Sequence, residues 1–184
     1  MENNIYSERI RRLSACMERA NIDAFVTLAA PSIRYLTGFT GEEAYLLAAG
    51  GRLHLIVDGR FTTQAQEECS WLDTIEYSGV FTNAMVPLLN AQHAHWLGFE
   101  KDRASFVQAE ELRAAFPAVA LVATQGLVDG LRLVKDDHEL ETMRAAGHVA
   151  DKAFRAMIAQ LRAGMTENET AALLEYEMRK AGAQ

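Results

Sequence analysis

Few residues in this sequence stand at the spacing that a metal or catalytic site requires. His138 and Glu139 begin like the H-E-x-x-H motif of a zinc site, but Thr142 stands where the second histidine must be. Two metal ligands on a helix share one face at a spacing of four residues, so the match fails. His93 and His95 would lie on one face of a strand and could share a metal. No third ligand stands nearby, however, and we interpret them as ordinary histidines. The residues by themselves therefore predict no catalytic residue and no metal ligand in this chain.

Other reactive side chains have simpler explanations. Asp136 and Asp137 could form a pair of catalytic carboxylates, but Asp136 stands three residues before Glu139, which is the spacing of a helix capping box. We therefore interpret Asp136 as a helix cap. Cys16 lies beside the apolar face of a predicted helix and is interpreted as a small core residue.

Two short stretches hold residues that could contact a substrate. The first, Tyr35–Gly41, is either a turn between strands or a loop that faces the active site of a partner subunit. In the second, Asp58 and Arg60 either form a structural ion pair at a strand end or leave Arg60 free to offer a fork of donors to a substrate carboxylate. The residues alone leave both alternatives open.

The elements that would position these residues alternate between strands and helices. Strand patterns cover residues 23–29, 44–48, 53–57, 74–77, 95–99 and 119–123, and helical patterns cover 7–21, 62–68, 83–92 and 106–116. Ser7 is the predicted N-cap of the first helix, Pro31 ends the first strand, and Gly50-Gly51 forms a hairpin turn. This order predicts an α/β domain with a largely buried sheet.

The pattern changes near residues 127–135, and no strand signal follows Asp136. Two amphipathic helices are predicted, one capped by Asp136 and Glu139 and the other by Thr166 and Glu169. Two such helices cannot bury their apolar faces alone. We therefore predict a domain over residues 1–130, followed over 131–184 by a linker and the first helices of an incomplete second domain.

Composition excludes several classes of function. The 184 residues carry 18 Lys and Arg against 25 Asp and Glu, a net charge of −7, which argues against a nucleic-acid partner. The longest uncharged stretch, Tyr77–Phe99, contains Pro87, amides and histidines and is unsuited to a membrane span. The N-terminus lacks a secretion signal, and two cysteines form no disulfide framework. We therefore expect a cytoplasmic protein.

Several segments, taken in order, resemble the pita-bread metallopeptidase family, which includes Xaa-Pro aminopeptidases, prolidases and creatinase. They are Ile33–Gly41 with Ser32 where asparagine is usual, Asp58–Phe61 followed by Gln64-Ala65, Leu97–Glu100, Leu131–Leu140 followed by Met143-Arg144 and Ala146, and Gly164–Glu167. The resemblance covers essentially the whole chain. It implies a creatinase-like N-terminal domain, with a mixed sheet flanked by helices, and the first two helices of a truncated pita-bread domain.

The resemblance also implies what the chain lacks. Members of the family hold two divalent metal ions, such as Mn, Co or Zn, on two Asp, one His and two Glu, and all five ligands lie beyond the point that matches Gln184. A pair of metal ions activates a bridging water and polarises the scissile carbonyl. No cofactor is therefore expected in this chain, which is predicted to be inactive alone.

The resemblance favours a function as the N-terminal part of a metal-dependent Xaa-Pro peptidase. This part would contribute dimerisation and substrate restriction, with Tyr35, Asp58, Arg60 and Phe61 close to a peptide substrate. Two alternatives remain, a non-catalytic binding or scaffold module and the N-terminal part of a creatinase-type amidinohydrolase. The expected partner is a second copy of the chain, because an uncovered helical stripe favours a twofold pairing.

Overall fold

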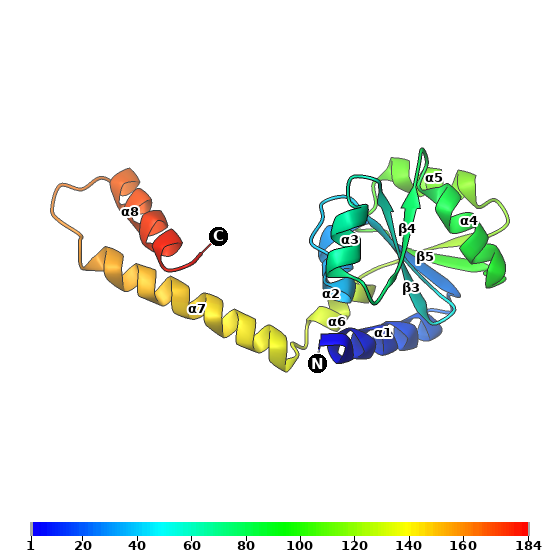
Figure 1. The fold of residues 1–184 in the computed structure, drawn as a ribbon, viewed down its shortest axis with the longest axis horizontal. Coiled ribbons are helices and arrows are strands. Elements are labelled where there is room, and N and C mark those ends of the chain that lie inside the picture. Colours follow the sequence, from blue (N-terminus) through cyan, green and yellow to red (C-terminus); the bar gives the residue numbers. More distant parts are fainter. Residues whose placement is uncertain (1, 184) are drawn as a thin grey trace. The chain divides into compact units, whose positions relative to one another are not determined.

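A computed structural model describes residues 2–183, with side chains from residue 5 onward. The chain divides into two compact units, Met1–Leu133 and Val134–Gln184, called here the first and the second unit. The first unit is a sheet covered by helices on both faces, and the second is a pair of helices (Figure 1).

The sheet of the first unit has six strands in the order β4-β3-β2-β1-β5-β6. Their bounds are Ala24–Thr27 (β1), Tyr45–Ala49 (β2), Arg52–Asp58 (β3), Asp73–Tyr77 (β4), Trp96–Glu100 (β5) and Ala120–Thr124 (β6). β2 is antiparallel to β1 and β3, and every other neighbouring pair is parallel. The hairpin between β2 and β3 turns at Gly50 and Gly51, whose φ angles of 58° and 74° suit a two-residue turn. The predicted mixed sheet is confirmed.

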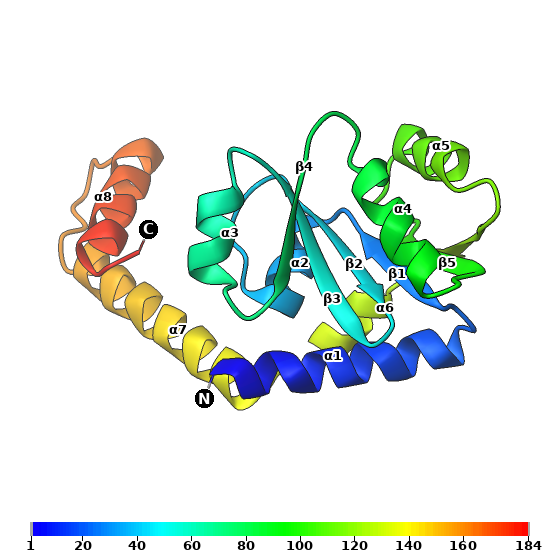
Figure 2. The ribbon, with the colours of Figure 1, turned by 45° about the vertical axis from the view of Figure 1, so that its right-hand side comes forward.

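Alternate side chains of the strands pack into two separate hydrophobic cores, one on each face of the sheet. One face of the sheet is covered by α1 (Glu2–Arg19), α2 (Ala30–Thr37), α3 (Thr62–Glu68) and α6 (Leu127–Arg132), and the other by α4 (Thr82–Ala91) and α5 (Phe106–Ala115) (Figure 2). In β1, for example, Phe25 packs into the first core while Ala24 and Val26 pack into the second. The strands are therefore almost continuously apolar, as expected for a sheet buried on both faces.

Two helices of the first unit differ from the sequence prediction. The stretch after Ala29 forms α2, whereas a strand break at Pro31 and a turn from Tyr35 were expected. Pro31 lies in the first helical turn, where its missing N–H leaves no hydrogen bond unmade, so it begins a helix here. The predicted boundary region, residues 127–135, contains the helix α6. This helix belongs to the first unit, because Val128 and Leu131 are buried in the first core.

Two smaller expectations are also wrong. Ser7 is not an N-cap but lies inside α1, which begins at Glu2. His93 and His95 do not share a strand face, because β5 begins only at Trp96 and His93 has a left-handed φ of 49°. The left-handed residue turns the chain between α4 and β5.

The second unit is a hairpin of α7 (Asp137–Ile158) and α8 (Glu167–Lys180). Both predicted capping boxes are present: the Asp136 carboxylate accepts from Glu139 N at 2.8 Å, and Thr166 Oγ1 accepts from Glu169 N at 3.2 Å. Among the described residues of this unit, the buried ones are Ala153, Met157 and Glu177. Large apolar side chains remain exposed on both helices, including Met143, Phe154, Ile158 and Tyr176.

Candidate substrate-side surface

The edge at which the parallel strands end gathers the polar side chains of the first unit. Five strands run in one direction, so Thr27, Asp58, Tyr77, Glu100 and Thr124 all end strands at this edge. Loops at the carboxyl ends of parallel strands are where open α/β sheets bind their ligands. This edge is therefore the candidate site of the first unit.

Arg60 lies at this edge in a cluster of two carboxylates. Its backbone N–H and Nε donate to Asp58 Oδ1 and Oδ2 at 2.8 and 3.0 Å, and Nη2 donates to Asp58 Oδ2 at 2.6 Å. The same Nη2 also pairs with Glu43. The side-chain hydrogen bond from Arg60 holds the pKa of Asp58 below its ordinary value. Asp58 thus fixes the orientation of a guanidinium that is 69% exposed.

Phe61 anchors the loop that carries Arg60. It precedes α3 and meets the ring of Phe39 edge-on, with ring centroids 6.3 Å apart. Gly41 fits against both rings, since a Cβ there would lie 2.3 Å from Phe39 and 3.0 Å from Phe61. Asp58, Arg60 and Phe61 therefore lie together, with the Asp58–Arg60 ion pair formed and Phe61 packed against Phe39.

Tyr35 lies elsewhere. Its side chain is buried, with Arg9 over the ring at 4.1 Å, and its hydroxyl donates to Leu131 O at 3.3 Å. Arg9 Nη1 also donates to Tyr35 O at 2.6 Å. Tyr35 therefore connects α1, α2 and α6 within the first unit, and its ring does not face solvent with Arg60.

A buried carboxyl group at the same edge was not recognised as a site residue from sequence. Glu100 is only 2% exposed and accepts from Thr27 Oγ1 at 2.5 Å and from Ser32 Oγ at 3.3 Å. β1 and β5 are neighbours, yet their chain connections lead to opposite sides of the sheet, so Glu100 stands at its topological switch point. Burial raises the pKa of Glu100. The sequence signal that could have identified Glu100 is a glutamate at the end of an apolar strand, as in Leu97–Glu100.

An aromatic group completes the edge and was also missed. Tyr45 stacks on Phe81 with ring centroids 3.7 Å apart and meets Tyr77 edge-on at 5.8 Å. Burial, with a smaller contribution from Tyr77, raises the pKa of Tyr45 to about 12, so its hydroxyl stays protonated. The strand patterns placed Tyr45 and Tyr77 near strand ends but contained no signal that β2 begins at the edge where β4 ends.

The described residues offer neither a cluster of metal ligands nor a membrane-spanning helix. Within the described part of the chain, no three His, Cys, Asp or Glu side chains come together as metal ligands. No described helix is long and apolar enough to cross a membrane. Cys69 is buried, which raises the pKa of its thiol to about 11, and Cys16 packs at the margin of the first core. Neither cysteine is placed as a nucleophile.

Two families match the chain, one for each unit. The Creatinase/Prolidase N-terminal domain matches residues 9–134, and Metallopeptidase family M24 matches residues 141–184. The second match lies within the helical hairpin and the first covers nearly all of the sheet unit.

Solved structures and curated relatives extend over both units. An Xaa-Pro dipeptidase from Bacillus anthracis is 30% identical with a TM-score of 0.91, over 97% of this chain and 50% of its own. An X-Pro aminopeptidase from Thermotoga maritima MSB8 is 34% identical with a TM-score of 0.82, over 91% and 49%. The Xaa-Pro dipeptidase of Pyrococcus horikoshii is 25% identical over 98% of this chain. The chain spans about half the length of the curated relatives it matches.

Proposed function

The chain belongs to the creatinase/prolidase N-terminal domain family, and we propose that it is the amino-terminal part of a Xaa-Pro peptidase. Such an enzyme hydrolyses the peptide bond before proline. The observation that carries the proposal is the order of the two matches along one chain, with a sheet unit followed by a hairpin that matches Metallopeptidase family M24. In this proposal the domain boundaries are those predicted from the sequence. Residues 1–130 form the creatinase-like domain, and residues 131–184 lead into the catalytic domain.

The metal centre of the enzyme lies outside these residues in this proposal. Metallopeptidases use divalent metal ions, but the described side chains offer no group of three ligands and so do not fit such a site. We assign two ions, such as Mn, Co or Zn, to the remainder of the enzyme. No catalytic step is assigned to this chain.

The contribution of the chain to substrate binding would come from Arg60. Asp58 and Glu43 occupy its Nε and Nη2, whereas Nη1 has no partner among the described residues. An exposed guanidinium with a free nitrogen can donate a charge-assisted hydrogen bond to a peptide carboxylate. Phe61 would keep the loop in place during that contact. The role proposed for this edge is to restrict the length of the peptide.

We further propose that the protein is a homodimer that pairs through the second unit. Phe154, Ile158 and Tyr176 are 51%, 50% and 60% exposed, and leaving such side chains in water forgoes about 25 cal/mol for each Å² of apolar surface. A twofold pairing of identical helices is the simplest closed arrangement. Both cysteines are free thiols, which supports a reducing compartment such as the cytoplasm.

The sequence that follows the Gln184 codon tests the main proposal. A reading frame that continues with two Asp, one His and two Glu in metal-ligand positions is expected, and the purified 184-residue chain should release no proline with Mn²⁺ or Co²⁺. A stop codon in every natural transcript would favour a scaffold module. Metal-dependent cleavage by the chain alone would contradict the assignment of the metal site.

Kinetics of the complete enzyme test the role of Arg60. Arg60→Ala should raise KM or relax length selectivity, because a lost hydrogen bond to a carboxylate costs about 1.5–3 kcal/mol of binding. Arg113→Ala is the matched control, since Arg113 is an exposed arginine on α5 paired with Glu110. Unchanged kinetics with a lower melting temperature would show that Arg60 forms only a structural ion pair.

Sedimentation at micromolar concentration tests the dimer. Phe154→Glu combined with Ile158→Glu should convert a dimer mass into a monomer mass, because a charge cannot be buried unpaired at an apolar interface. A monomer mass for the unaltered chain would refute this pairing without affecting the proposed enzyme class.

A further inference from the structure

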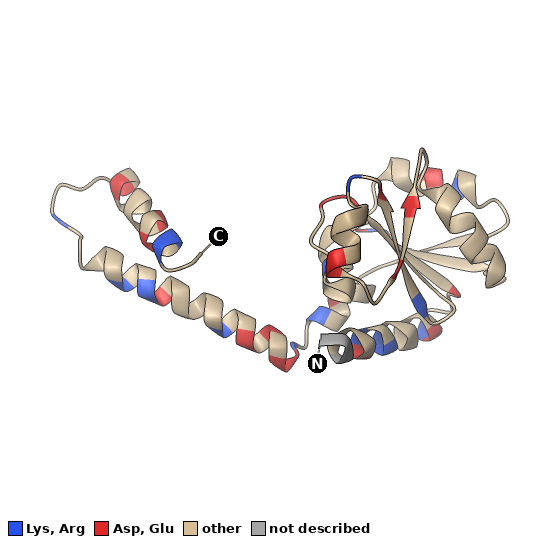
Figure 3. Cartoon of the chain, viewed as in Figure 1, with Lys and Arg blue, Asp and Glu red and all other residues tan. Residues whose placement is uncertain are grey.

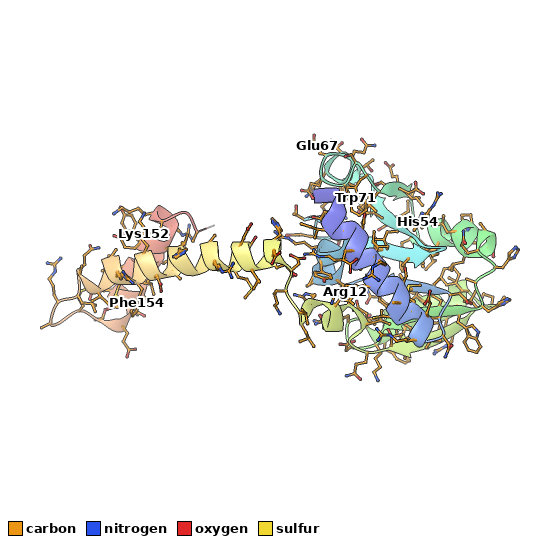
Figure 4. All side chains as sticks on the ribbon, turned by 90° about the horizontal axis from the view of Figure 1, so that it is seen from below. Arg12, His54, Glu67, Trp71, Lys152 and Phe154 are labelled. Atoms are coloured by element: carbon orange, nitrogen blue, oxygen red, sulfur yellow. The ribbon has the colours of Figure 1, made fainter. Side chains whose placement is uncertain are left out.

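An open groove on the first unit is lined by none of the residues around Arg60. It has a volume of about 890 Å³ and runs between the second half of α1 and the short helix α6. Arg12 and Arg19 of α1 line it together with Ala15 and Cys16, and Gly126 and Gly130 line it from the other side. Figure 4 shows Arg12 projecting from α1.

Two arginines in this groove form no ion pair with any described residue. Arg12 Nη2 donates to the carbonyl of Leu131 at 3.1 Å, and Arg19 donates to Ala15 O at 3.2 Å and to Cys16 Sγ at 3.0 Å. These acceptors are neutral, and within the described residues neither guanidinium reaches a carboxylate at ion-pair distance. Each contact orients its guanidinium without compensating its charge. Unpaired arginines are conspicuous in a chain with a net charge of −7.

The acidic side chains near the groove compensate only part of its positive charge. Arg11 also lines it, but Glu8 binds Arg11 through two hydrogen bonds of 2.8 and 2.6 Å. Glu18 is the one acidic side chain among the groove residues, and it is exposed. Basic positions recur along α1, as the blue segments in Figure 3 show. The groove is therefore a local positive surface.

Between the two arginines the floor of the groove is formed by small side chains, those of Ala15 and Cys16. Arg12 and Arg19 are seven residues apart, about 10.5 Å along the axis and on one face of α1. On the opposite wall, a Cβ added to Gly126 or Gly130 would meet no atom within 4 Å. Glycine inside a helix makes that helix less stable than alanine would. The open space around Gly130 shows that packing within this unit does not require a glycine there. The backbone of α6 is thus accessible to a closely approaching chain.

These features select the occupant. One small anion cannot bridge two guanidinium groups about 10.5 Å apart along a helix, whereas carboxylates two turns apart on a second helix match that spacing. An open groove suits a peptide better than a small molecule, which prefers an enclosed pocket. A long polyphosphate backbone would meet the acidic remainder of the surface. We propose that the groove between α1 and α6 binds an acidic helical segment of a partner protein, with its carboxylates on Arg12 and Arg19.

Fluorescence anisotropy with a labelled peptide tests this interaction. The probe is a capped Ala/Leu helix with two glutamates at the spacing of Arg12 and Arg19, and the control peptide has glutamine at both positions. The unaltered chain should bind the glutamate peptide saturably and at least about tenfold more tightly than the control, as charge-assisted hydrogen bonds require. Raising the salt concentration should weaken binding, since the groove is exposed.

Two variants of the chain sharpen the test. Arg12→Gln with Arg19→Gln should abolish the preference for the glutamate peptide. Gly130→Leu, which has open space for its side chain, should block the groove and weaken binding while both arginines remain. Arg113→Gln on α5 is the control and should bind as the unaltered chain does. The Arg12→Gln/Arg19→Gln variant changes the α1 side of the groove, and Gly130→Leu changes the α6 side. If one variant fails to fold, the other still tests whether the peptide binds in the groove.

Several outcomes would overturn the proposal. Equal affinity for the two peptides, or full affinity in the Arg12→Gln/Arg19→Gln variant, would show that carboxylates are not recognised here. Complete displacement of the peptide by inorganic pyrophosphate at equal concentration would identify a small-anion site. A dimer that dissociates when Arg12 and Arg19 are replaced would assign the groove to a second copy of the chain.

Discussion

The two units of this chain reach their structure by different means. The first unit buries both faces of a six-stranded sheet, and Phe25, Leu46, Leu55 and Leu97 are at most 1% exposed. The second unit is a helical hairpin in which Phe154 and Tyr176 remain more than half exposed. Its helix starts are nevertheless fully capped, by Asp136 with Glu139 and by Thr166 with Glu169.

The difference separates local from tertiary stabilisation. Capping hydrogen bonds satisfy the orphan N–H groups of a helix whether or not a core lies beside it. Burial of apolar area requires strands and helices from distant parts of the sequence. The first unit should therefore respond most to core substitutions, and the second most to substitutions at the helix ends.

The largest difference between the two units is expected when one phenylalanine in each unit is replaced by alanine. Phe25→Ala should lower the free energy of unfolding by about 3–5 kcal/mol, because it leaves a cavity in the first core. At protein concentrations too low for dimers to form, Phe154→Ala should change it by no more than about 0.5 kcal/mol, as at other surface positions. Urea denaturation followed by circular dichroism detects both units. A comparable loss from Phe154→Ala would reveal a second core around the hairpin.

What could be predicted from sequence follows the same division. The two capped helices were predicted correctly because the information lies within a few neighbouring residues, such as Asp136 and Glu139. α2 was missed because Pro31 ends a strand and begins a helix with equal ease. α6 was missed because its apolar residues, Val128 and Leu131, looked like a linker until their contacts with the core were known.

The positions of the candidate site residues could be predicted in part, for a related reason. Asp58, Arg60 and Phe61 are adjacent in the chain, so their spacing was enough to bring them together. Tyr35 stands on an amphipathic helix, and only the packing of α1 and α6 shows that its ring is buried. The contact between Thr27 and Glu100 joins residues 73 positions apart, and a single sequence contains no signal for it.

Adding a methyl group at a left-handed glycine in each unit gives the next largest difference. Gly38 ends α2 with φ 85°, and a Cβ there would lie 2.4 Å from Tyr6 Oη. Gly164 has φ 93°, but a Cβ there would meet nothing within 4 Å. Both Gly→Ala changes should cost about 1–2 kcal/mol for the left-handed backbone. Gly38→Ala should cost about 1–3 kcal/mol more, because Tyr6 must move.

Thermal melting of the two glycine variants measures that difference. Tyr6→Phe, introduced together with Gly38→Ala, should recover part of the loss, since it removes the closest atom. Equal costs at Gly38 and Gly164 would mean that the backbone conformation alone determines the effect. The packing of α1 against the end of α2 would then contribute nothing to it.

Removing a helix cap tests the second unit at a smaller scale. Asp136→Ala should destabilise the start of α7 by about 1 kcal/mol, because its carboxylate accepts the Glu139 N–H. Asp137→Ala, one residue along, removes a similar charge but no capping hydrogen bond, and should cost about 0.3 kcal/mol. Amide hydrogen exchange in the first turn of α7 distinguishes the two. Equal protection in both variants would show that charge at the helix end, rather than the capping hydrogen bond, stabilises this unit.

The smallest effect expected is a change in how the stability of the first unit depends on pH. Burial raises the pKa of Glu100 above its ordinary value of 4.5, with Asp129 and Asp102 adding to the rise and the hydrogen bonds from Thr27 and Ser32 opposing it. Arg103 also interacts electrostatically with Glu100, but its ion pair is with Asp129, which binds Arg132 as well. The folded protein therefore holds the Glu100 proton more tightly than the unfolded chain does.

The sign of the pH effect follows from that difference in proton affinity. Stability contributed by the neutral Glu100 carboxyl is complete below pH 4.5 and is lost as the pH rises through the raised pKa. Glu100→Gln, which stays neutral, should flatten this part of the stability profile, measured by urea denaturation across the acidic and neutral range. Thr27→Val removes a donor that lowers the pKa and should move the same loss to higher pH. If Glu100→Gln kept the slope of the unaltered protein, the carboxyl would already be ionised in its buried position, and the hydroxyls of Thr27 and Ser32 would be stabilising a buried carboxylate between β1 and β5.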